Sequence, residues 1–402
     1  MGASPLRLGE RALIEKLNYV SLFTGAGGLD IGLERTGFNA LSLCEIESVF
    51  CKTLEANRGR RHDDGIEYFK ESTVLNADIR DLTGADLAAD IDLDLVVGGP
   101  PCQAFSSSGK QLSVLDPRGN LVNEFIRIVS ELRPRMLLFE NVRGLVTARD
   151  SQGEPGGVVR NLLDQLQELG YSCRASLLNS ADFGAYQRRV RCFIVGSMQG
   201  TAPLFPEPTH DKTAGMFNPR WQSLHAFLEQ YADADKTSYI FPTEKLGRQL
   251  SELPDGTGLK SAGRAEKTRP GGHWGYRQGT FIADLSLPAR TVTGSASQDW
   301  VRWDGTLRRL TLNEAKLLQG FPSDWEILGT KSQRYKQVGN AVPTVFGELL
   351  GEMIQTFLKS YPSTPPVPLD FPKTFRGYID YTKKDQARNG DSRVVHKNFE
   401  SR

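Results

Sequence analysis

The chain has 402 residues, a hydrophobic content of 39% and a formal net charge of +1. This length and apolar content suffice for a large core and predict a division into two domains. No apolar run reaches transmembrane length and no charged-then-apolar signal segment is found at the start, so we expect no membrane partner. Its five cysteines are scattered without a Cys-x-x-Cys pair, which argues against a disulfide framework and a metal site and favours a reducing, cytoplasmic setting.

Charge is distributed unevenly along the chain. Residues 1–100 carry 10 Lys or Arg and 17 Asp or Glu, whereas residues 245–340 carry 15 and 9. A basic region on an otherwise neutral chain suits a polyanionic partner, although a solvated surface is the ordinary explanation of such a bias.

The first predicted strand occupies residues 19–23, and a glycine-rich turn follows it. The turn occupies residues 24–30, and the helix after it should end near Gly37. Such a turn lets a ligand approach the backbone closely, with helix-terminal N–H groups facing it. The third glycine of the dinucleotide fingerprint would fall at Asp30, so a nicotinamide cofactor is disfavoured.

Acidic residues end the next two predicted strands. Glu45 follows the glycines by about twenty residues, a spacing that suits a carboxylate binding a ribose hydroxyl pair. Asp78 could accept a hydrogen bond from an adenine amino group or bond to its own turn. Each acid alone is more often a cap or a solvated turn residue. With the glycine-rich turn after the first strand, these two acids make three such strand ends in succession, which favours a nucleoside cofactor.

A cysteine follows a buried strand predicted at residues 93–97. The sequence Gly-Gly-Pro-Pro separates this strand from Cys102, and the two prolines restrict the backbone that enters the cysteine. Ligands of open α/β sheets lie beyond the carboxyl ends of the strands. Cys102 is therefore a candidate nucleophile, although a small buried residue in a strand-to-helix turn is the commoner fate of a cysteine.

Glu140 directly follows another apolar strand, at residues 136–139. A carboxylate in that place is costly unless it is paired or reactive, and it should emerge at the same sheet edge as Cys102. The two residues form a plausible catalytic pair. Further along, Arg189 and Arg191 should share one face of an extended segment, where they suit a phosphate or a polarised carbonyl, or simply begin a surface strand.

The remaining segments are predicted from their periodicity and composition. Residues 200–300 are rich in proline, glycine and polar residues, and 255–280 suit nucleic-acid contact or an ordinary irregular subdomain. The long polar stretch 105–119 is typical of a functional or disordered loop. We also expect helices at 120–132, 161–170, 312–318 and 344–358, a strand at 173–178, and a polar turn at 337–343. The first seventeen residues are typical of a loose lead-in or an added helix, and a loosely ordered tail is expected after residue 360.

Six short strings stand out in this order: FTGAGG at 23–28, PPCQ at 100–103, ENV at 140–142, QRRVR at 187–191, RTVT at 290–293 and QVGN at 337–340. Each is weak evidence alone. Together they resemble the ordered motifs of the DNA (cytosine-5) methyltransferases, over nearly all of residues 19–358. In that family these are the cofactor loop, the nucleophile, the acid, the arginine motif, the end of the variable region and the final cofactor motif.

The resemblance implies an α/β fold: a Rossmann-like S-adenosylmethionine-dependent methyltransferase domain with a smaller, irregular, β-rich target-recognition domain. The expected divisions are a catalytic part at 1–199, the recognition domain at 200–310, a segment at 311–360 that completes the catalytic domain, and a tail at 361–402. It also implies a monomer that is nucleoid-associated, acts on double-stranded DNA and pairs functionally with a restriction endonuclease.

The resemblance further assigns roles to individual residues. It implies that the target cytosine is flipped out of the duplex, since its C6 atom cannot be reached in the stack. Cys102 would add to C6, Glu140 would protonate N3, Arg191 would hold the O2 edge with Arg189 in support, and C5 would then take the methyl group. The residues implied around S-adenosylmethionine are Phe23, Gly25, Gly27, Gly28, Leu29, Glu45, Ile46, Asp78, Ile79, Gly99, Pro101, Leu121, Asn340 and Val342. Those implied at the DNA are Gln103, Ser106, Lys110, Arg264, Lys267, Arg269, Tyr276 and Arg277.

Two alternatives remain open at this point. A tRNA cytosine methyltransferase shares the core motifs, although a variable region of roughly one hundred residues favours a reader of DNA. A catalytically silent DNA-binding relative would have no need of Cys102 and Glu140. An exocyclic-amine methyltransferase is disfavoured because such enzymes need no cysteine.

Overall fold

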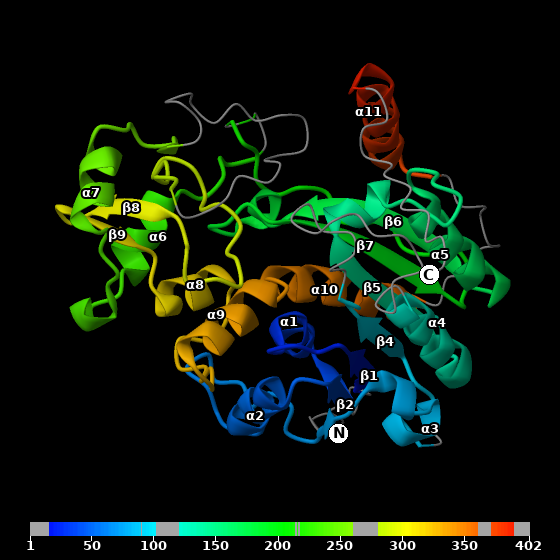
Figure 1. Ribbon diagram of the computed structural model, residues 1–402. Coiled ribbons are helices and arrows are strands. Elements are labelled where there is room, and N and C mark those ends of the chain that lie inside the picture. Colours follow the sequence, from blue (N-terminus) through cyan, green and yellow to red (C-terminus); the bar gives the residue numbers. More distant parts are fainter. Residues whose placement is uncertain are drawn as a thin grey trace, which may run out of the picture.

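The computed structural model describes residues 16–89, 91–101, 120–213, 215, 218–259, 280–360 and 371–389. Its centre is a seven-stranded sheet of order β3-β2-β1-β4-β5-β7-β6 (Figure 1). The first five strands in the chain are parallel and the last two are antiparallel to their neighbours. The strands are β1 Leu17–Leu22, β2 Phe38–Glu45, β3 Thr73–Asn76, β4 Leu95–Gly98, β5 Met136–Val142, β6 Ser172–Asn179 and β7 Val190–Ser197.

This order confirms the α/β fold and the strands predicted from the sequence. Strand β1 lies between β2 and β4, so the chain reverses its direction of progress across the sheet at that point. Open α/β sheets bind ligands at such a reversal, beyond the carboxyl ends of the strands. The register of β7 brings Arg191 opposite Val142, so the beginning of this antiparallel strand also lies at that edge.

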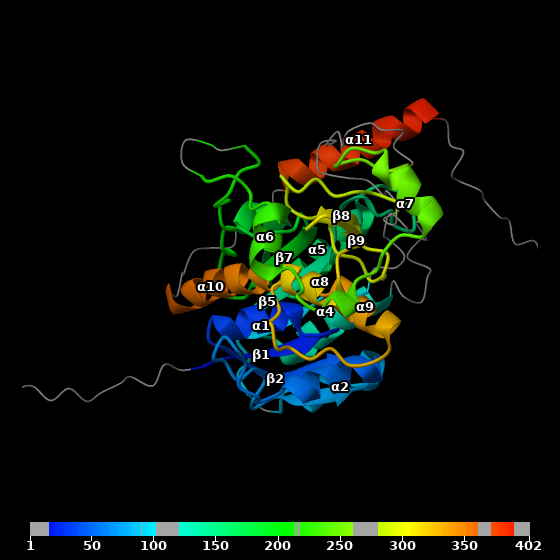
Figure 2. The same cartoon turned by 90° about the vertical axis from the view of Figure 1, so that its left-hand side faces the viewer.

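Helices cover both faces of the sheet, as Figures 1 and 2 show. Alternate residues of the central strands point to opposite faces, which makes two apolar cores. Val97 and Leu138 belong to one core, and Val96 and Leu137 belong to the other. The helices of this part are α1 Gly28–Arg35, α2 Ser48–Asn57, α3 Gly84–Leu87, α4 Asn120–Leu132 and α5 Gly157–Glu168.

The C-terminal helix α10 (Thr344–Ser360) packs directly on α1 through glycines. A Cβ atom added to Gly32 would lie 2.2 Å from the carbonyl oxygen of Thr344, and one added to Gly347 would lie 2.1 Å from that of Leu29. Neither position can hold a side chain unless the backbones move apart. Segments about three hundred residues apart in the sequence therefore share one interface.

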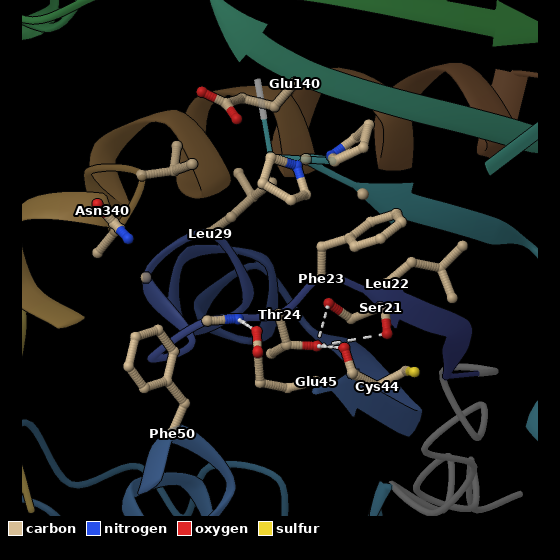
Figure 3. A pocket seen from close by; sticks show the side chains of 18 of the residues that line it. Ser21, Leu22, Phe23, Thr24, Leu29, Cys44, Glu45, Phe50, Glu140 and Asn340 are labelled. Carbon is tan, nitrogen blue, oxygen red and sulfur yellow. Dashed lines mark hydrogen bonds between the residues drawn. The ribbon is translucent and has the colours of Figure 1, made fainter. Parts of the chain in front are cut away.

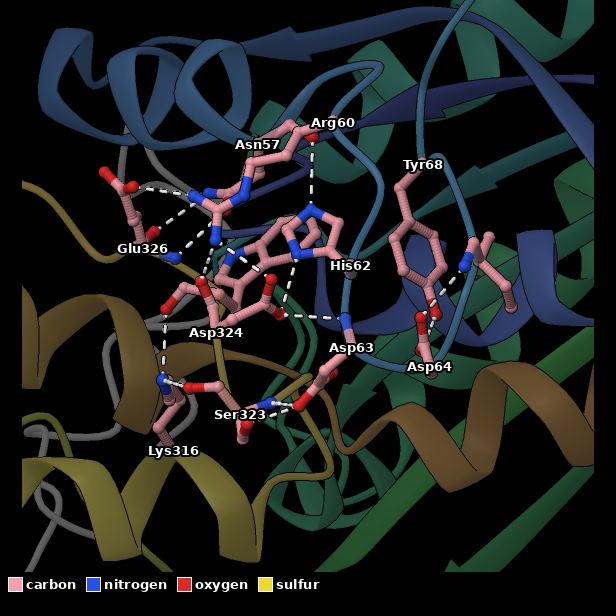
Figure 4. A network of polar contacts seen from close by, with 12 residues as sticks. Asn57, Arg60, His62, Asp63, Asp64, Tyr68, Lys316, Ser323, Asp324 and Glu326 are labelled. Atoms are coloured by element: carbon pink, nitrogen blue, oxygen red, sulfur yellow. Dashed lines mark hydrogen bonds and ion pairs between the residues drawn. The ribbon is translucent and has the colours of Figure 1, made fainter.

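A polar network also joins the two ends of the chain (Figure 4). Arg60 donates to the Asp324 carboxylate at 2.9 Å, and the buried ring of His62 contacts the same carboxylate at 3.0 Å. Burial alone would raise the pKa of Asp324, but hydrogen bonds from His62, Arg60 and the Asp63 amide lower it to about 2. Lys316 donates to the carbonyl oxygen of Ser323 within the 316–326 segment. The bonds of Asp324 to Arg60 and His62 fix this segment to the N-terminal part.

The predicted polar turn at 337–343 is wrong in its first part. Helix α8 (Leu312–Leu318) is where the sequence predicts it, but a second helix, α9 (Lys331–Asn340), includes residues 337–340. A capping box between Thr330 and Gln333 begins α9, and its apolar residues Tyr335 and Val338 are buried. Two apolar positions in ten residues are too few for a recognisable helical period.

The segment between β7 and α8 is irregular, as expected for 200–310. Its helices are α6 Leu224–Tyr231 and α7 Glu244–Ser251, and strands β8 Trp300–Trp303 and β9 Thr306–Arg309 form a hairpin. In the described residues of this segment, the named strands are β8 and β9. Two strands are fewer than the resemblance implies for a β-rich domain. Leu224 and Phe227 belong to the same apolar core as Val97. The segment thus shares a core with the main sheet.

The prediction of a loosely ordered tail after residue 360 is wrong for residues 373–389. These form helix α11 (Lys373–Asn389), and its residues Phe375 and Ile379 are buried. The two lie four positions apart, so they share one helix face. Charged residues surround this short apolar stripe, so the sequence pattern did not reveal it.

No helix in the described ranges combines the length and the apolar character that a bilayer crossing requires.

The α1–α10 interface predicts the effect of a single methyl group. We expect Gly32→Ala to lower the free energy of unfolding by about 1–3 kcal/mol, because overpacking forces the backbones apart. Gly377→Ala on α11 is the matched control, since nothing lies within 4 Å of its added Cβ atom. Alanine favours a helix over glycine, so the control should be neutral or stabilising in urea unfolding. Equal destabilisation by both changes would refute the close packing.

Candidate functional site

A pocket of about 550 Å³ opens at the carboxyl edge of the sheet, at the reversal between β1 and β4 (Figure 3). Its walls come from the loop after β1, the ends of β2, β3, β4 and β5, the start of β7 and the end of α9. Segments from both ends of the chain therefore build one cavity, whose size is in the usual range for small-molecule and cofactor sites.

The glycine loop lies open to this pocket. Phe23 and Gly25 have positive φ angles of 58° and 63°, a conformation that is strained for phenylalanine. No atom lies within 4 Å of a Cβ atom built on Gly25, so the loop leaves space where a side chain would be. A ligand can therefore approach the backbone at Gly25.

Glu45 is fixed beside that loop. Its Oε2 accepts a hydrogen bond from the Gly25 amide at 2.8 Å, and its Oε1 accepts one from the Glu47 amide at 2.8 Å. Burial raises the pKa of Glu45, although both amide bonds oppose the shift. Each carboxylate oxygen keeps a further lone pair for a donor in the pocket.

Asp78 adopts the second of its two predicted arrangements and bonds to its own turn. It caps the short 3-10 helix η1 (Ile79–Asp81) by accepting from the Arg80 amide at 3.0 Å. The Arg80 side chain also donates to it at 2.9 Å, and this interaction lowers the pKa of Asp78. Ile46, which lines the same side of the pocket, is 59% exposed and offers an apolar surface.

Glu140 lies at the opposite wall, where β5 ends. Its Oε1 is 2.9 Å from Nε of Arg191. A Cβ atom on Gly99 would come within 2.7 Å of its Oε2, so a side chain there would displace the carboxylate from this position. Burial raises the pKa of Glu140, while the guanidinium groups of Arg191 and Arg189 oppose that shift. Burial therefore favours the protonated form of this carboxyl group more than solvent would.

Arg189 and Arg191 both line the pocket, but they make different contacts. The Arg189 side chain is 1% exposed and donates to the carbonyl oxygens of Val292 and Gly339, each at 2.7 Å. It connects β7 to the 292 segment and to the end of α9. Arg191 carries the contact with Glu140, and Arg189 holds the surrounding backbone in place.

A hydrogen bond fixes the turn that precedes the predicted nucleophile, Cys102. The Asn141 side chain donates to the carbonyl oxygen of Pro100 at 3.2 Å, which fixes the turn after β4 to the end of β5. Pro101 lines the pocket and directly precedes Cys102. Cys102, Gln103, Ser106 and Lys110 lie outside the described residues, as do Arg264, Lys267, Arg269, Tyr276 and Arg277.

The residues implied around the cofactor meet in this one pocket, with one exception. Gly27 is not among the lining residues, because it caps α1 with a φ angle of 84° and faces Leu54 and Phe69. Sequence reasoning also missed Phe50 and the pair Lys336–Glu47, whose Nζ and Oε1 atoms are 2.8 Å apart at the pocket wall. Those partners are 289 residues apart, and no local pattern joins them. The lining residues that the sequence implied are Phe23, Gly25, Gly28, Leu29, Glu45, Ile46, Asp78, Ile79, Gly99, Pro101, Leu121, Glu140, Arg189, Arg191, Asn340 and Val342.

The fold and this pocket define an α/β protein with a ligand site at the carboxyl edge of its sheet. The C-5 cytosine-specific DNA methylase family model matches residues 17–356, and the chain belongs to that family. It is 32% identical to the Type II methyltransferase M1.HphI of Haemophilus parahaemolyticus, over 84% of this chain and 86% of that one. It is 30% identical to M.NgoMIV of Neisseria gonorrhoeae, over 85% and 97%.

Solved structures share the fold at lower identity. The methyltransferase EhMeth of Entamoeba histolytica superposes with a TM-score of 0.60 at 17% identity, over 86% of this chain and 99% of that one. The DNMT2 protein of Spodoptera frugiperda gives a TM-score of 0.58 at 20% identity, over 85% and 100%.

The different contacts of the two arginines predict different variants. We expect Arg189→Ala to lower the free energy of unfolding by about 3 kcal/mol or more, because it leaves buried carbonyl groups without donors. Arg191→Ala should cost less stability and mainly change the site, since it removes the cation beside Glu140. Urea unfolding and methyl transfer measured on both variants test this difference. If Arg189→Ala proved more stable than Arg191→Ala, the predicted difference between the two arginines would be contradicted.

Proposed function

We propose that this chain is a sequence-specific Type II DNA (cytosine-5) methyltransferase that transfers a methyl group from S-adenosylmethionine to C5 of a flipped cytosine. The observation that carries the proposal is the pairing of Glu140 with Arg191 across the pocket from Glu45, beside the turn that leads into Cys102. The Type II methyltransferases similar to this chain support the same activity and a functional pairing with a restriction endonuclease.

The pocket fits S-adenosylmethionine in its chemistry. The open space at Gly25 admits a ligand close to the backbone, and Glu45 offers acceptors to a pair of ribose hydroxyls. Ile46 and Phe50 supply apolar surface for an adenine ring, with Asp78 nearby. When bound, S-adenosylmethionine supplies an electrophilic methyl group, and the chain positions it. Asn340 and Val342 bring the end of α9 to the same site.

The chain's own residues would prepare the cytosine ring for this transfer. The Cys102 thiolate adds to C6 while Glu140 donates its proton to N3, so the electron pair of the C5–C6 bond makes C5 nucleophilic. Arg191 lies beside Glu140 and can hold the O2 atom of the base. After methylation, loss of the C5 proton, return of the N3 proton to Glu140 and expulsion of the thiolate restore the ring and the enzyme. Burial raises the pKa of Glu140, which favours the protonated form that a proton donor to N3 requires.

Duplex DNA is the proposed substrate, bound by a monomer. The target base must leave the stack, because C6 is otherwise out of reach. We assign sequence reading to 200–310 and completion of the catalytic domain to 311–360, with Arg264, Lys267, Arg269, Tyr276 and Arg277 as base or phosphate contacts. Gln103, Ser106 and Lys110 would close over the base.

The covalent step predicts a trapped complex. Wild type should form an irreversible adduct with duplex DNA that contains 5-fluorocytosine, because fluorine cannot leave C5 as a cation. Cys102→Ala should form no adduct and transfer no methyl group while it still binds DNA. Denaturing gel electrophoresis detects the adduct. An adduct with Cys102→Ala, or transfer by that variant, would overturn the role of Cys102.

The contacts around the acids predict how cofactor affinity should change. Glu45→Gln keeps the shape but weakens the acceptors, and we expect it to reduce S-adenosylmethionine binding by about 1–3 kcal/mol. Asp78→Asn should cost less, because Arg80 already occupies both carboxylate oxygens. Titration calorimetry measures both. Unchanged affinity in Glu45→Gln would place the ribose elsewhere.

A further inference from the structure

Helix α11 lies beyond the matched family region, which ends at residue 356, yet it is firmly attached to the catalytic part. Phe375 is fully buried in the core that also contains Phe139 and Val146. Ile379 packs on Gly156, where an added Cβ atom would lie 2.5 Å from its Cδ1. These contacts fix the position of α11 on the surface.

That position is next to the candidate site. Helix α11 contacts the 3-10 helix η2 (Arg143–Thr147), which begins directly after β5. The Arg143 guanidinium lies over the Tyr378 ring, 5.7 Å from its centroid. Val142, the residue before Arg143, lines the pocket. The surface of α11 therefore continues the rim of the pocket.

The outer side of this helix is basic. Residues 373–389, which form α11, carry 5 Lys or Arg and 2 Asp or Glu, on a chain whose formal net charge is +1. Lys373, Arg376 and Lys383 are exposed, and the exposed Arg160 of α5 lies over the Phe371 ring at 5.6 Å.

The described acidic partner of Lys383 holds it only weakly. Lys383 pairs with Glu154 at 3.3 Å, and both side chains are more than half exposed. An exposed pair of this kind contributes little, so another anion can replace Glu154. On α11 itself, Asp380 is the acid that the structure describes as exposed. The net charge of the face remains positive.

Figures 1 and 2 place α11 and α7 at the same end of the molecule, and Figure 1 shows them on opposite sides of it. Helix α7 belongs to the segment that we assign to sequence reading. A duplex whose target base enters the pocket would extend away from the site in both directions. One of those directions passes from the rim at η2 towards α11.

We propose that the exposed basic face of α11 binds the phosphate backbone of duplex DNA that flanks the target site. This inference rests on the proposed function and adds a second DNA contact outside the recognition sequence. Phosphate contacts carry no sequence information, but they raise affinity and make it depend on salt. The helix would thus strengthen binding to long DNA without changing the target sequence.

The test compares two duplexes around a cytosine that wild type methylates. One covers only the site, and the other extends by one helical turn (about 10 base pairs) on each side. The variant Lys373→Gln/Arg376→Gln/Lys383→Gln neutralises the face. The control variant Lys16→Gln/Lys52→Gln/Lys70→Gln removes the same charge from exposed positions near β1, α2 and β3, at the other end of the molecule in Figure 1. Binding is measured from low to high salt.

Wild type should bind the long duplex more tightly and with a steeper salt dependence. The α11 variant should lose that advantage, and its slope of log affinity against log salt should fall by about 0.9 for each lost phosphate contact. The control should behave as wild type. Asp380→Lys should bind the long duplex more tightly than wild type does.

Two results would overturn the inference. One is an α11 variant with the salt slope and duplex preference of the control. The other is a variant whose methyl transfer is reduced equally on both duplexes while the salt slope of its binding is unchanged. Helix α11 would then only support the fold of the site. Failure of wild type to bind or methylate any duplex would instead refute the proposed function.

Discussion

A buried carboxylate at the end of β5 is the constraint on which the rest of the site depends. Glu140 is 7% exposed, and a charge in such a place requires a partner. Arg191 is that partner only because β7 runs antiparallel to β5 and brings Arg191 opposite Val142. Arg189, two residues earlier on the same face, then bonds to the backbone of Val292 and Gly339. One strand register thus joins the acid, the cation and the end of α9.

The same assembly explains why the chain must fold as a whole before the pocket exists. Glycines at the α1–α10 contact bring two backbones together, and the Arg60–Asp324 bond fixes the segment before α9. The pocket wall at Asn340 consequently depends on contacts made far from it. A cofactor bound there would bridge both ends of the chain and stabilise the folded state by mass action.

Much of this could be predicted from the sequence, for physical reasons that particular residues make clear. Buried parallel strands are continuous apolar runs, so β4 and β5 were recognisable, and polar residues placed directly after them marked the edge at Glu140. The role of Gly99 could not be predicted, since it depends on where Glu140 Oε2 lies. The Lys336–Glu47 pair and the buried face of α11 depend on tertiary contacts between distant residues, and charge patterns gave no sign of them. Helix α9 was missed because its apolar residues are too few.

The central claim is methyl transfer to C5 of cytosine in duplex DNA. Its most direct test incubates the purified chain with S-adenosylmethionine and random-sequence duplex DNA, and then maps methylated bases by conversion sequencing. The account predicts 5-methylcytosine at one recurring short sequence, and no methylation of tRNA offered under the same conditions. Methyl groups found on tRNA, on exocyclic amines, or on no nucleic acid at all would contradict it.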